Sequence, residues 1–376
     1  MKRTKKILVG FLAALSVLCG SLGLAACGDN ESASSSNSSS VEQGSNVFSQ
    51  GLKYTLLSNN TYEVTGIGDC TDTEILIPAT YNGKAVTSIG DGAFLNCRSL
   101  TSVEIPDSVE SIGDYAFSSC SSLTYNEKDN LKYLGNEQNP YIYLAYVSDN
   151  SITSATIEST CKFIGSLAFR SCSSLTSVVI GDSVKSIGYG AFEDCTSLTS
   201  IEIPDSVTSI GDWAFSNCSS LTSIEIPDSV TSIGEGAFRY CDSLTSIEIP
   251  DSVTSIGSYA FYNCSSLTSI EIPDSVTSIG SYAFSDCYSL TSIEIPDSVT
   301  SIGDYAFSDC YSLTSVVIGD SVTYIGEDSF YNCTSLTSIE IPDSVTSIGD
   351  SAFYHCSSLT SIEIPDSVTS IGNSAF

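Results

Sequence analysis

The chain has 376 residues, enough for two or three ordinary domains, although a fixed internal repeat changes how domains are counted. It carries 13 Lys and Arg against 44 Asp and Glu, which gives a formal net charge of −31. A surface this acidic repels phosphate backbones, so nucleic acid is excluded as the expected partner, whereas basic partners and cations are favoured.

A basic segment (MKRTKK) and an apolar run of about twenty residues open the chain, and together they predict export. The run ends at Leu24–Cys27 (LAAC), which resembles a bacterial lipobox. The resemblance implies a signal peptide over residues 1–26, cleavage before Cys27, and a lipid on the Cys27 thiol. The alternative is an uncleaved membrane anchor. Both interpretations place the rest of the chain outside the cytoplasm, and we expect a lipid-anchored protein of the cell membrane, displayed at the cell surface.

Residues 27–50 are rich in Ser and poor in apolar side chains, so they predict a flexible tether. We expect a capping hairpin over residues 51–69 and a repeat solenoid over residues 70–376. An irregular insert near residues 124–160 interrupts the repeat. The chain stops at Phe376 in mid-repeat with no polar segment after it, so the C-terminal cap that solenoids need is expected to be missing.

Cysteine marks the period of the repeat, because one Cys recurs every 23 residues from Cys172 to Cys356. The fourteen residues LTSIEIPDSVTSIG appear seven times without a change, first at 198–211. In that coil SIEIP alternates polar and apolar residues, which predicts a strand with Ile201 and Ile203 inward. Val207 and Ile210 predict a second short extended segment. Gly211 is interpreted as a turn residue, and DWAFSNC as a helical or 3₁₀ turn.

One coil cannot bury eight apolar side chains alone, whereas stacking about thirteen coils buries a continuous core. The pattern Cys-x-x-Leu-x-x-Ile-x-Ile-Pro-x-x-Val-x-x-Ile-Gly-x-x-Ala-Phe resembles the BspA-type leucine-rich repeat, over roughly Cys70–Phe376. The resemblance implies a right-handed, mainly β superhelix with 23-residue coils, a parallel sheet on its concave face and short turns or 3₁₀ segments elsewhere. It also implies a bacterial surface protein that binds host matrix proteins or other cells.

The cysteine column allows three interpretations: a series of disulfides, a row of metal-binding sites, or a ladder of buried thiols. Parallel Cβ vectors disfavour disulfides, and the column contains no CxxC-like pair, so the thiol ladder is preferred. His355 is the single histidine, so no Ser–His–Asp or Cys–His arrangement can form. We therefore expect no catalytic residue, no cofactor site and no enzyme activity.

Two acidic ladders run along the coils, one of Glu and one of Asp. The interpretation preferred for both is a solvated ladder. The alternative is a Ca²⁺ site, since Ca²⁺ takes carboxylate oxygens. That metal would lie along Asp205, Asp228, Asp251, Asp274 and Asp297.

Variation between coils is concentrated in the turns, where aromatic residues recur, and in the insert. Exposed Tyr and Trp are common binding anchors. The candidate ligand-binding residues are Trp213, Tyr259, Tyr282, Tyr305, Tyr141 and Tyr143.

Taken with the resemblance, these features predict a non-enzymatic, lipid-anchored, adhesin-like protein. Its partner would be a macromolecule, protein or glycan, and it would meet the membrane through the lipid on Cys27. The alternative function is a structural spacer that displays a C-terminal domain absent from this chain.

Overall fold

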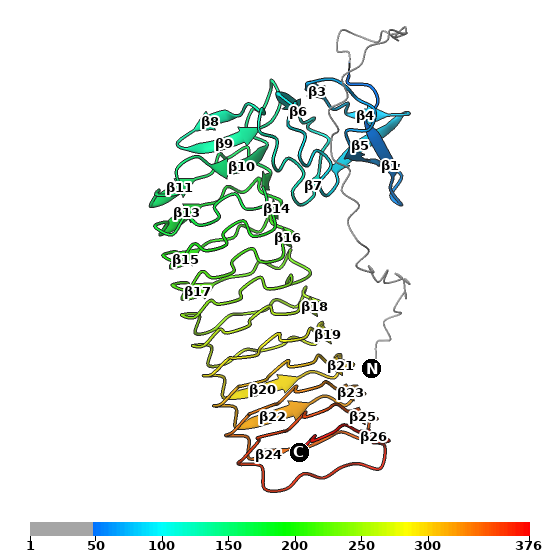
Figure 1. The fold of residues 1–376 in the computed structure, drawn as a ribbon, viewed down its shortest axis with the longest axis vertical. Coiled ribbons are helices and arrows are strands. Elements are labelled where there is room, and N and C mark those ends of the chain that lie inside the picture. Colours follow the sequence, from blue (N-terminus) through cyan, green and yellow to red (C-terminus); the bar gives the residue numbers. More distant parts are fainter. Residues whose placement is uncertain (1–47) are drawn as a thin grey trace, which may run out of the picture. The chain divides into compact units, whose positions relative to one another are not determined.

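The computed structural model describes residues 48–376; the predicted signal peptide, Cys27 and most of the predicted tether lie outside them. Residues 48–376 contain strands and turns but no helix, and so no helical segment there could cross a bilayer. About 13 coils, about 23 residues apart, stack into a β-solenoid (Figure 1). The repeat solenoid predicted from the sequence is confirmed.

The Leu-x-x-Ile-x-Ile segment forms the first of two parallel ladders, in which each residue pairs with its equivalent one coil away. Ser200 lies opposite Ser223, and Ile201 lies opposite Ile224. Ile201 is buried while Glu202 is exposed, as the alternation predicts. The first ladder comprises β3 (Glu74–Leu76), β6 (Ser102–Glu104), β11 (Ser154–Thr156), β13 (Ser177–Val179), β15 (Ser200–Ile201), β17 (Ser223–Ile224), β20 (Ser292–Ile295), β22 (Ser315–Ile318) and β24 (Ser338–Ile339).

The Ser-Ile-Gly segment forms the second ladder, which follows the other side of the stack in Figure 1. It confirms the second extended segment predicted around Val207 and Ile210, and Ile210 pairs in parallel with Ile187. The second ladder comprises β5 (Lys84–Ile89), β7 (Ser111–Ile112), β12 (Phe163–Ile164), β14 (Ser186–Ile187), β16 (Ser209–Ile210), β18 (Ser255–Ile256), β19 (Ser278–Ile279), β21 (Ser301–Ile302), β23 (Tyr324–Ile325), β25 (Ser347–Ile348) and β26 (Ser370–Ile371).

Two regions depart from the regular coil. At the start, β1 (Lys53–Leu56) and β2 (Tyr62–Gly66) form an antiparallel hairpin, and β2 and the short β4 (Thr80–Tyr81) pair with β5. In the insert, β8 (Asn126–Lys128), β9 (Leu131–Leu134) and β10 (Tyr143–Val147) form an antiparallel sheet, and β10 pairs in parallel with β12. The insert therefore interrupts the second ladder between β7 and β12.

The turn edge, defined as the seven residues after each Ser-Ile-Gly (residues 212–218 in one coil), is not the helical or 3₁₀ turn that the sequence predicts. Its backbone N–H groups alternate in direction. Those of Trp213 and Phe215 donate to carbonyls of the next coil, whereas that of Ser216 donates to the Trp213 carbonyl. Trp213 has a φ of 59° and Asn217 a φ of 57°, so left-handed residues break any continuous helical run. The turn edge is a third line of hydrogen bonds between coils.

Gly211 has a different role from the one predicted, because its φ lies outside the left-handed region. A Cβ at this position would lie 2.7 Å from the backbone of Gly188 and Tyr189 in the preceding coil. Glycine recurs here because the two backbones approach closely, and the left-handed conformations fall on the turn edge instead.

Phenylalanine forms the centre of the core. Phe192, Phe215 and Phe238 stack on one another at centroid distances of 5.3 and 5.6 Å, with their rings within 3° of parallel. The same column extends to Phe376, and Leu, Val, Ile, Ala and Cys fill the rest of the interior. Each coil covers the apolar face of the next, which is why the sequence repeats.

Candidate functional site

The cysteine column is a ladder of buried thiols. The Sγ atom of Cys195 donates to the backbone carbonyl of Phe169 in the preceding coil at 3.2 Å, and Cys218 donates to Phe192 in the same way. Desolvation by burial raises the pKa of these thiols. A protonated thiol is a poor nucleophile and a poor metal ligand, so the column packs and bonds rather than reacts.

His355 occupies a turn-edge slot that has a positive φ in each coil with a column cysteine from Cys97 onward, and its own φ is 62°. Asn and Asp hold this slot in most coils, as the left-handed conformation favours. The His355 ring is exposed and lies 4.2 Å from the Tyr354 ring. Its environment is that of a turn residue.

Both acidic ladders lie in solvent. Asp205, Asp228 and Glu202 are exposed, and within residues 48–376 no three His, Cys, Asp or Glu side chains form a group that could hold a metal ion. One aspartate has a structural role: Asp297 Oδ1 accepts a hydrogen bond from the backbone N–H of Asp320 at 2.7 Å. The calcium ladder at Asp205–Asp297 stays a prediction.

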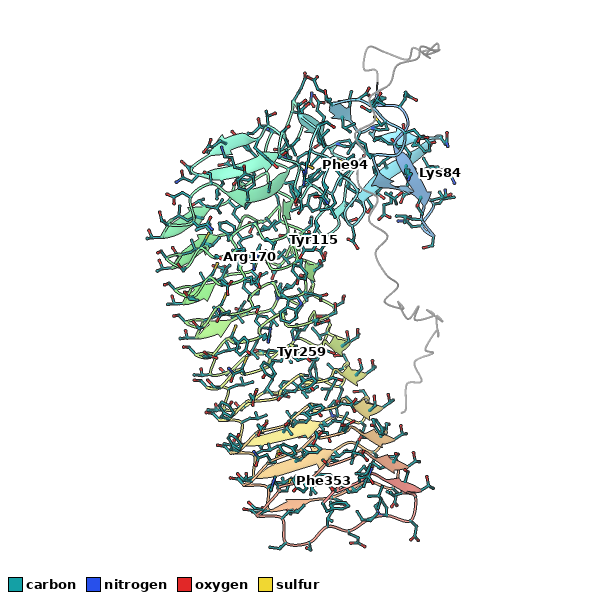
Figure 2. All side chains as sticks on the ribbon, in the orientation of Figure 1. Lys84, Phe94, Tyr115, Arg170, Tyr259 and Phe353 are labelled. Atoms are coloured by element: carbon teal, nitrogen blue, oxygen red, sulfur yellow. The ribbon has the colours of Figure 1, made fainter. Side chains whose placement is uncertain are left out.

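The four aromatic residues proposed from the sequence lie on one line of the turn edge (Figure 2 labels Tyr259). The Tyr259 and Tyr282 rings stack at 4.7 Å, the Tyr282 and Tyr305 rings stack at 4.5 Å, and Trp213 lies 6.5 Å from Tyr259. We call these four residues the aromatic edge. Because their faces cover one another, they present ring edges and hydroxyl groups to solvent.

Each residue of the aromatic edge has an unfavourable backbone conformation for its type. Trp213, Tyr259, Tyr282 and Tyr305 have φ values of 58–59°, whereas Gly fills the same slot at Gly236. A bulky residue in the left-handed region costs about 1–2 kcal/mol. Stacking of an aromatic pair returns about 0.5–1.5 kcal/mol beyond the area it buries. The slot therefore holds aromatic residues at a backbone cost that glycine would not incur.

A cation that the sequence reasoning missed lies within this edge. The Trp213 ring lies against Gly236, where a Cβ would be 2.7 Å from it, and the Arg239 guanidinium carbon lies 5.0 Å from the Trp213 centroid. It also lies 4.5 Å from Tyr240 and 5.4 Å from Tyr262, and Arg239 Nε is buried without a hydrogen-bond partner. Arg239 is one of few basic residues in the repeats, and this rarity is the feature of the sequence that could have singled it out.

The predicted residues of the insert lie apart from the aromatic edge. Tyr141 is half-buried and packs against Tyr133, with Lys128 Nζ 5.9 Å from the Tyr141 ring centroid. Tyr143 is only 5% exposed, and its ring meets Phe117 edge-on at 5.3 Å. Tyr143 therefore cannot act as an exposed anchor.

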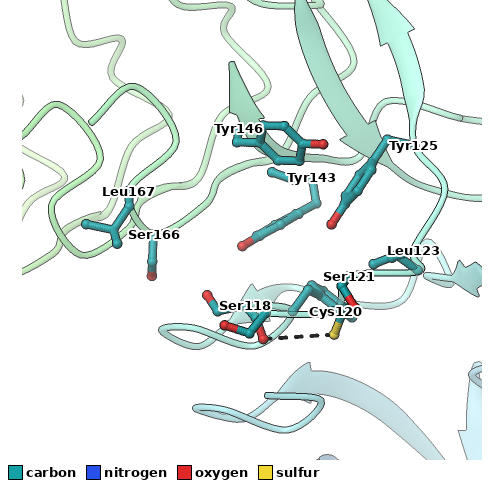
Figure 3. A pocket seen from close by; sticks show the side chains of 12 residues that line it. Ser118, Cys120, Ser121, Leu123, Tyr125, Tyr143, Tyr146, Ser166 and Leu167 are labelled. Carbon is teal, nitrogen blue, oxygen red and sulfur yellow. Dashed lines mark hydrogen bonds between the residues drawn. The ribbon is translucent and has the colours of Figure 1, made fainter. Parts of the chain in front are cut away.

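Tyr143 instead lines a pocket of about 460 Å³ at the interruption of the second ladder (Figure 3). Tyr125 and Tyr146 form one wall, with their rings edge-to-face at 5.0 Å. Ser118 and Ser166 come from the coils on either side of the insert. Burial raises the pKa of Tyr125, so its hydroxyl stays protonated and can donate a hydrogen bond. The irregular spacing near residues 124–160 marked this region, but it did not identify Tyr125 or the serines.

Comparison with known proteins identifies the family of the chain. The model of the BspA-type leucine-rich repeat region matches residues 69–138, 142–268 and 254–376. Among solved structures, a leucine-rich repeat protein from Bacteroides ovatus is 31% identical, with 89% of this chain and 92% of that chain covered and a TM-score of 0.46. A leucine-rich cell surface protein from Faecalibacterium prausnitzii is 32% identical, with 89% and 96% covered and a TM-score of 0.41. No curated protein matches the chain. Because the family model matches most of its residues, the chain belongs to the BspA-type leucine-rich repeat family.

Proposed function

We propose that the protein is a lipid-anchored, adhesin-like binding protein of the cell surface, without catalysis, that holds a protein partner at the aromatic edge. Proteins built from leucine-rich repeats are in general binding scaffolds, and membership of this family supports a binding role. Lipid anchoring rests on the LAAC motif at residues 24–27 and on no structural observation.

One observation carries the placement of the site: Trp and Tyr occupy a left-handed slot in four of five successive coils, whereas Gly, Asp, Ser, and once each Leu and Tyr, stand there in the other coils. Backbone strain that the fold does not need is typical of functional positions. The aromatic edge and Arg239 also lie in the part of the coil whose sequence varies from coil to coil, whereas the sequence of the ladder strands is nearly constant.

The surroundings of the aromatic edge define the partner's chemistry. Asp304, Glu327 and Asp328 lie beside Tyr305 or Tyr282, and the Asp328 carboxylate, which hydrogen-bonds the Tyr305 hydroxyl, raises the pKa of that tyrosine. A complementary surface carries Lys or Arg next to apolar groups. Such an interface associates faster at low ionic strength than at high ionic strength.

The test uses the single tryptophan of the chain as its probe. Full-length protein is titrated with purified matrix proteins and mucins while Trp213 emission is recorded, and immobilised partners are used for pull-down. We expect a saturable emission change and its loss in the Tyr259→Gly, Tyr282→Gly double variant. Glycine fits this slot, as Gly236 shows, so the variant should remain folded.

Two controls make the result decisive. Tyr81→Ala changes a tyrosine that is 37% exposed on β4, in the hairpin region before the regular coils, and should leave binding unchanged. Binding that persists in the double variant would contradict the aromatic edge as the site, and no binding to any partner would contradict the function. Separately, a labelled fatty acid should be incorporated into the wild-type chain and not into Cys27→Ser; no incorporation into the wild type, or equal incorporation into the variant, would contradict lipid anchoring at Cys27.

A further inference from the structure

The pocket at the interruption of the second ladder has a chemical character unlike the rest of the molecule. Its lining consists of Ser, Tyr, Phe, Leu, Ala and Cys, with no Asp, Glu, Lys or Arg. This composition is unusual in a chain with 44 acidic residues. Asp114, in the same turn edge as Ser118, is already engaged: its Oδ1 accepts hydrogen bonds from Ser166 Oγ and the Tyr189 N–H, both at 2.9 Å.

Five hydroxyl groups of the pocket are available to a ligand, whereas that of Ser166 is bonded to Asp114. Within residues 48–376, the side-chain hydroxyls of Ser118, Ser119, Ser121, Tyr125 and Tyr146 make no hydrogen bond to protein. Each of them can both donate and accept, so together they match a ligand that carries many hydroxyl groups of its own. Ser118, Ser119 and Ser121 lie in or just after the turn edge of one coil, and Tyr125 and Tyr146 come from the insert, so two different parts of the chain supply hydroxyl groups to the lining.

The aromatic wall supplies the apolar half of the recognition. Tyr146 is 39% exposed, and its ring is perpendicular to Tyr125, at an interplanar angle of 85°. In an edge-to-face pair only one face of one ring is covered, so ring surface remains open to the pocket. The electron-rich face of a ring attracts the slightly positive C–H groups of a flat, saturated ligand.

We propose that this pocket binds a neutral pyranose sugar, either free or at the end of a glycan. The sugar's C–H face packs on the tyrosine wall, and its hydroxyl groups bond to the serine and tyrosine hydroxyls. A cavity of about 460 Å³ falls within the range of small-molecule sites, about 300–1,000 Å³. This inference goes beyond the proposed function and concerns a place separate from the aromatic edge.

The test is ligand-observed saturation-transfer NMR on the full-length protein with methyl glycosides of neutral hexoses, and with methyl glucuronide as the charged counterpart. We expect transfer to a neutral glycoside and at least about fivefold weaker binding of the glucuronide, because the pocket offers no cation to its carboxylate. An array of neutral oligosaccharides forms the second arm. A response there stronger than that of the free glycoside identifies a glycan end as the ligand, and an equal response identifies the free sugar.

Variants of Tyr146 decide whether the binding lies in the pocket. Tyr146→Ala should weaken it about tenfold or more, since the exposed ring is removed, and Tyr146→Phe should weaken it less, since only the hydroxyl is lost. Tyr324→Ala, at a similar exposure outside the pocket, should change nothing, and neither should Tyr259→Gly on the aromatic edge. Circular dichroism melts verify that each variant is folded. Absence of transfer to every neutral glycoside, or equal binding by the wild type and Tyr146→Ala, would overturn the proposal.

Discussion

Cys195 and Phe169 are 26 positions apart in the chain, yet the thiol of one donates to the backbone carbonyl of the other at 3.2 Å. The same carbonyl also accepts the backbone N–H of Cys172. The contact recurs from coil to coil, as between Cys264 and Phe238. Cysteine therefore fills a small apolar space and links two coils with one atom.

We expect Cys264→Ala to lower the free energy of unfolding by about 1–2 kcal/mol, because it removes a buried atom and one weak hydrogen bond. The loss is modest because the Phe238 carbonyl keeps its bond from the Cys241 N–H. Urea denaturation of the wild type and the variant measures it. Cys264→Ser retains a donor and should cost no more than the alanine variant. A much larger loss of unfolding free energy in Cys264→Ala would show that the thiol stabilises the fold by more than its packing and one hydrogen bond.

The buried thiols also predict how stability depends on pH, and Cys161, which lies outside the cysteine column at the position of Val184 in the next coil, is the example. Burial raises the pKa of Cys161 to about 12 from 9.0, so the folded chain keeps this proton when the unfolded chain has lost it. Stability from this source is complete below pH 9 and is lost as the pH rises from 9 toward 12, at up to about 1.4 kcal/mol per pH unit for each such thiol.

Thermal melts from neutral to alkaline pH test this dependence. The midpoint should stay constant up to about pH 8 and then fall, and Cys161→Val should reduce the slope of that fall. A midpoint that is flat through pH 11 would contradict neutral burial of the thiols.

The ladders, the core positions and the packing role of the cysteines could be predicted from the sequence, because a period of 23 residues forces equivalent residues to stack. The role of Gly211 could not, since one-dimensional spacing does not distinguish a left-handed turn from a close approach of two backbones. The alternating hydrogen bonds around Trp213 were missed for the same reason. The pocket beside Tyr146 lies where the repeat is interrupted. Periodic spacing therefore could not predict that Tyr125 and the serines opposite it line a pocket.

The close approach of coils makes one glycine column intolerant of any side chain. A Cβ at Gly280 would lie 2.4 Å from the backbone nitrogen of Ser258, whereas at Gly66 the nearest atom would be 3.7 Å away. We expect Gly280→Ala to cost several kcal/mol, about 3 or more, through displaced backbone, and Gly66→Ala to cost less than about 1 kcal/mol. Chemical denaturation of both variants measures the difference. Equal costs would show that the coils separate easily.

The acidic ladders predict a response to salt rather than to a particular metal. Neighbouring exposed carboxylates one coil apart, such as Asp228 and Asp251, repel by about 1 kcal/mol in water before screening. We expect sodium chloride to raise the melting midpoint, and Ca²⁺ at matched ionic strength to raise it no further than Mg²⁺ or the chelator control. A specific rise with Ca²⁺ that Asp228→Asn and Asp251→Asn remove would establish the calcium ladder instead.

At Tyr282 on the aromatic edge, we expect a glycine variant to be more stable than an alanine variant, which is the reverse of the usual order. Tyr282 stacks on two neighbours and has a φ of 58°. Tyr282→Ala loses both ring stacks and keeps the left-handed backbone strain, so it should lower the free energy of unfolding by about 2 kcal/mol. Tyr282→Gly also loses the ring stacks but releases the strain, so it should be about 1 kcal/mol more stable than the alanine variant.

Tyr324 on β23 provides the matched control, because its φ lies outside the left-handed region. There the usual order should hold, with Tyr324→Gly about 0.5–1 kcal/mol less stable than Tyr324→Ala. Denaturant midpoints of the four variants test both signs together. If glycine were worse than alanine at residue 282 as well, the backbone would not be strained there, and the main reason for assigning function to the aromatic edge would fail.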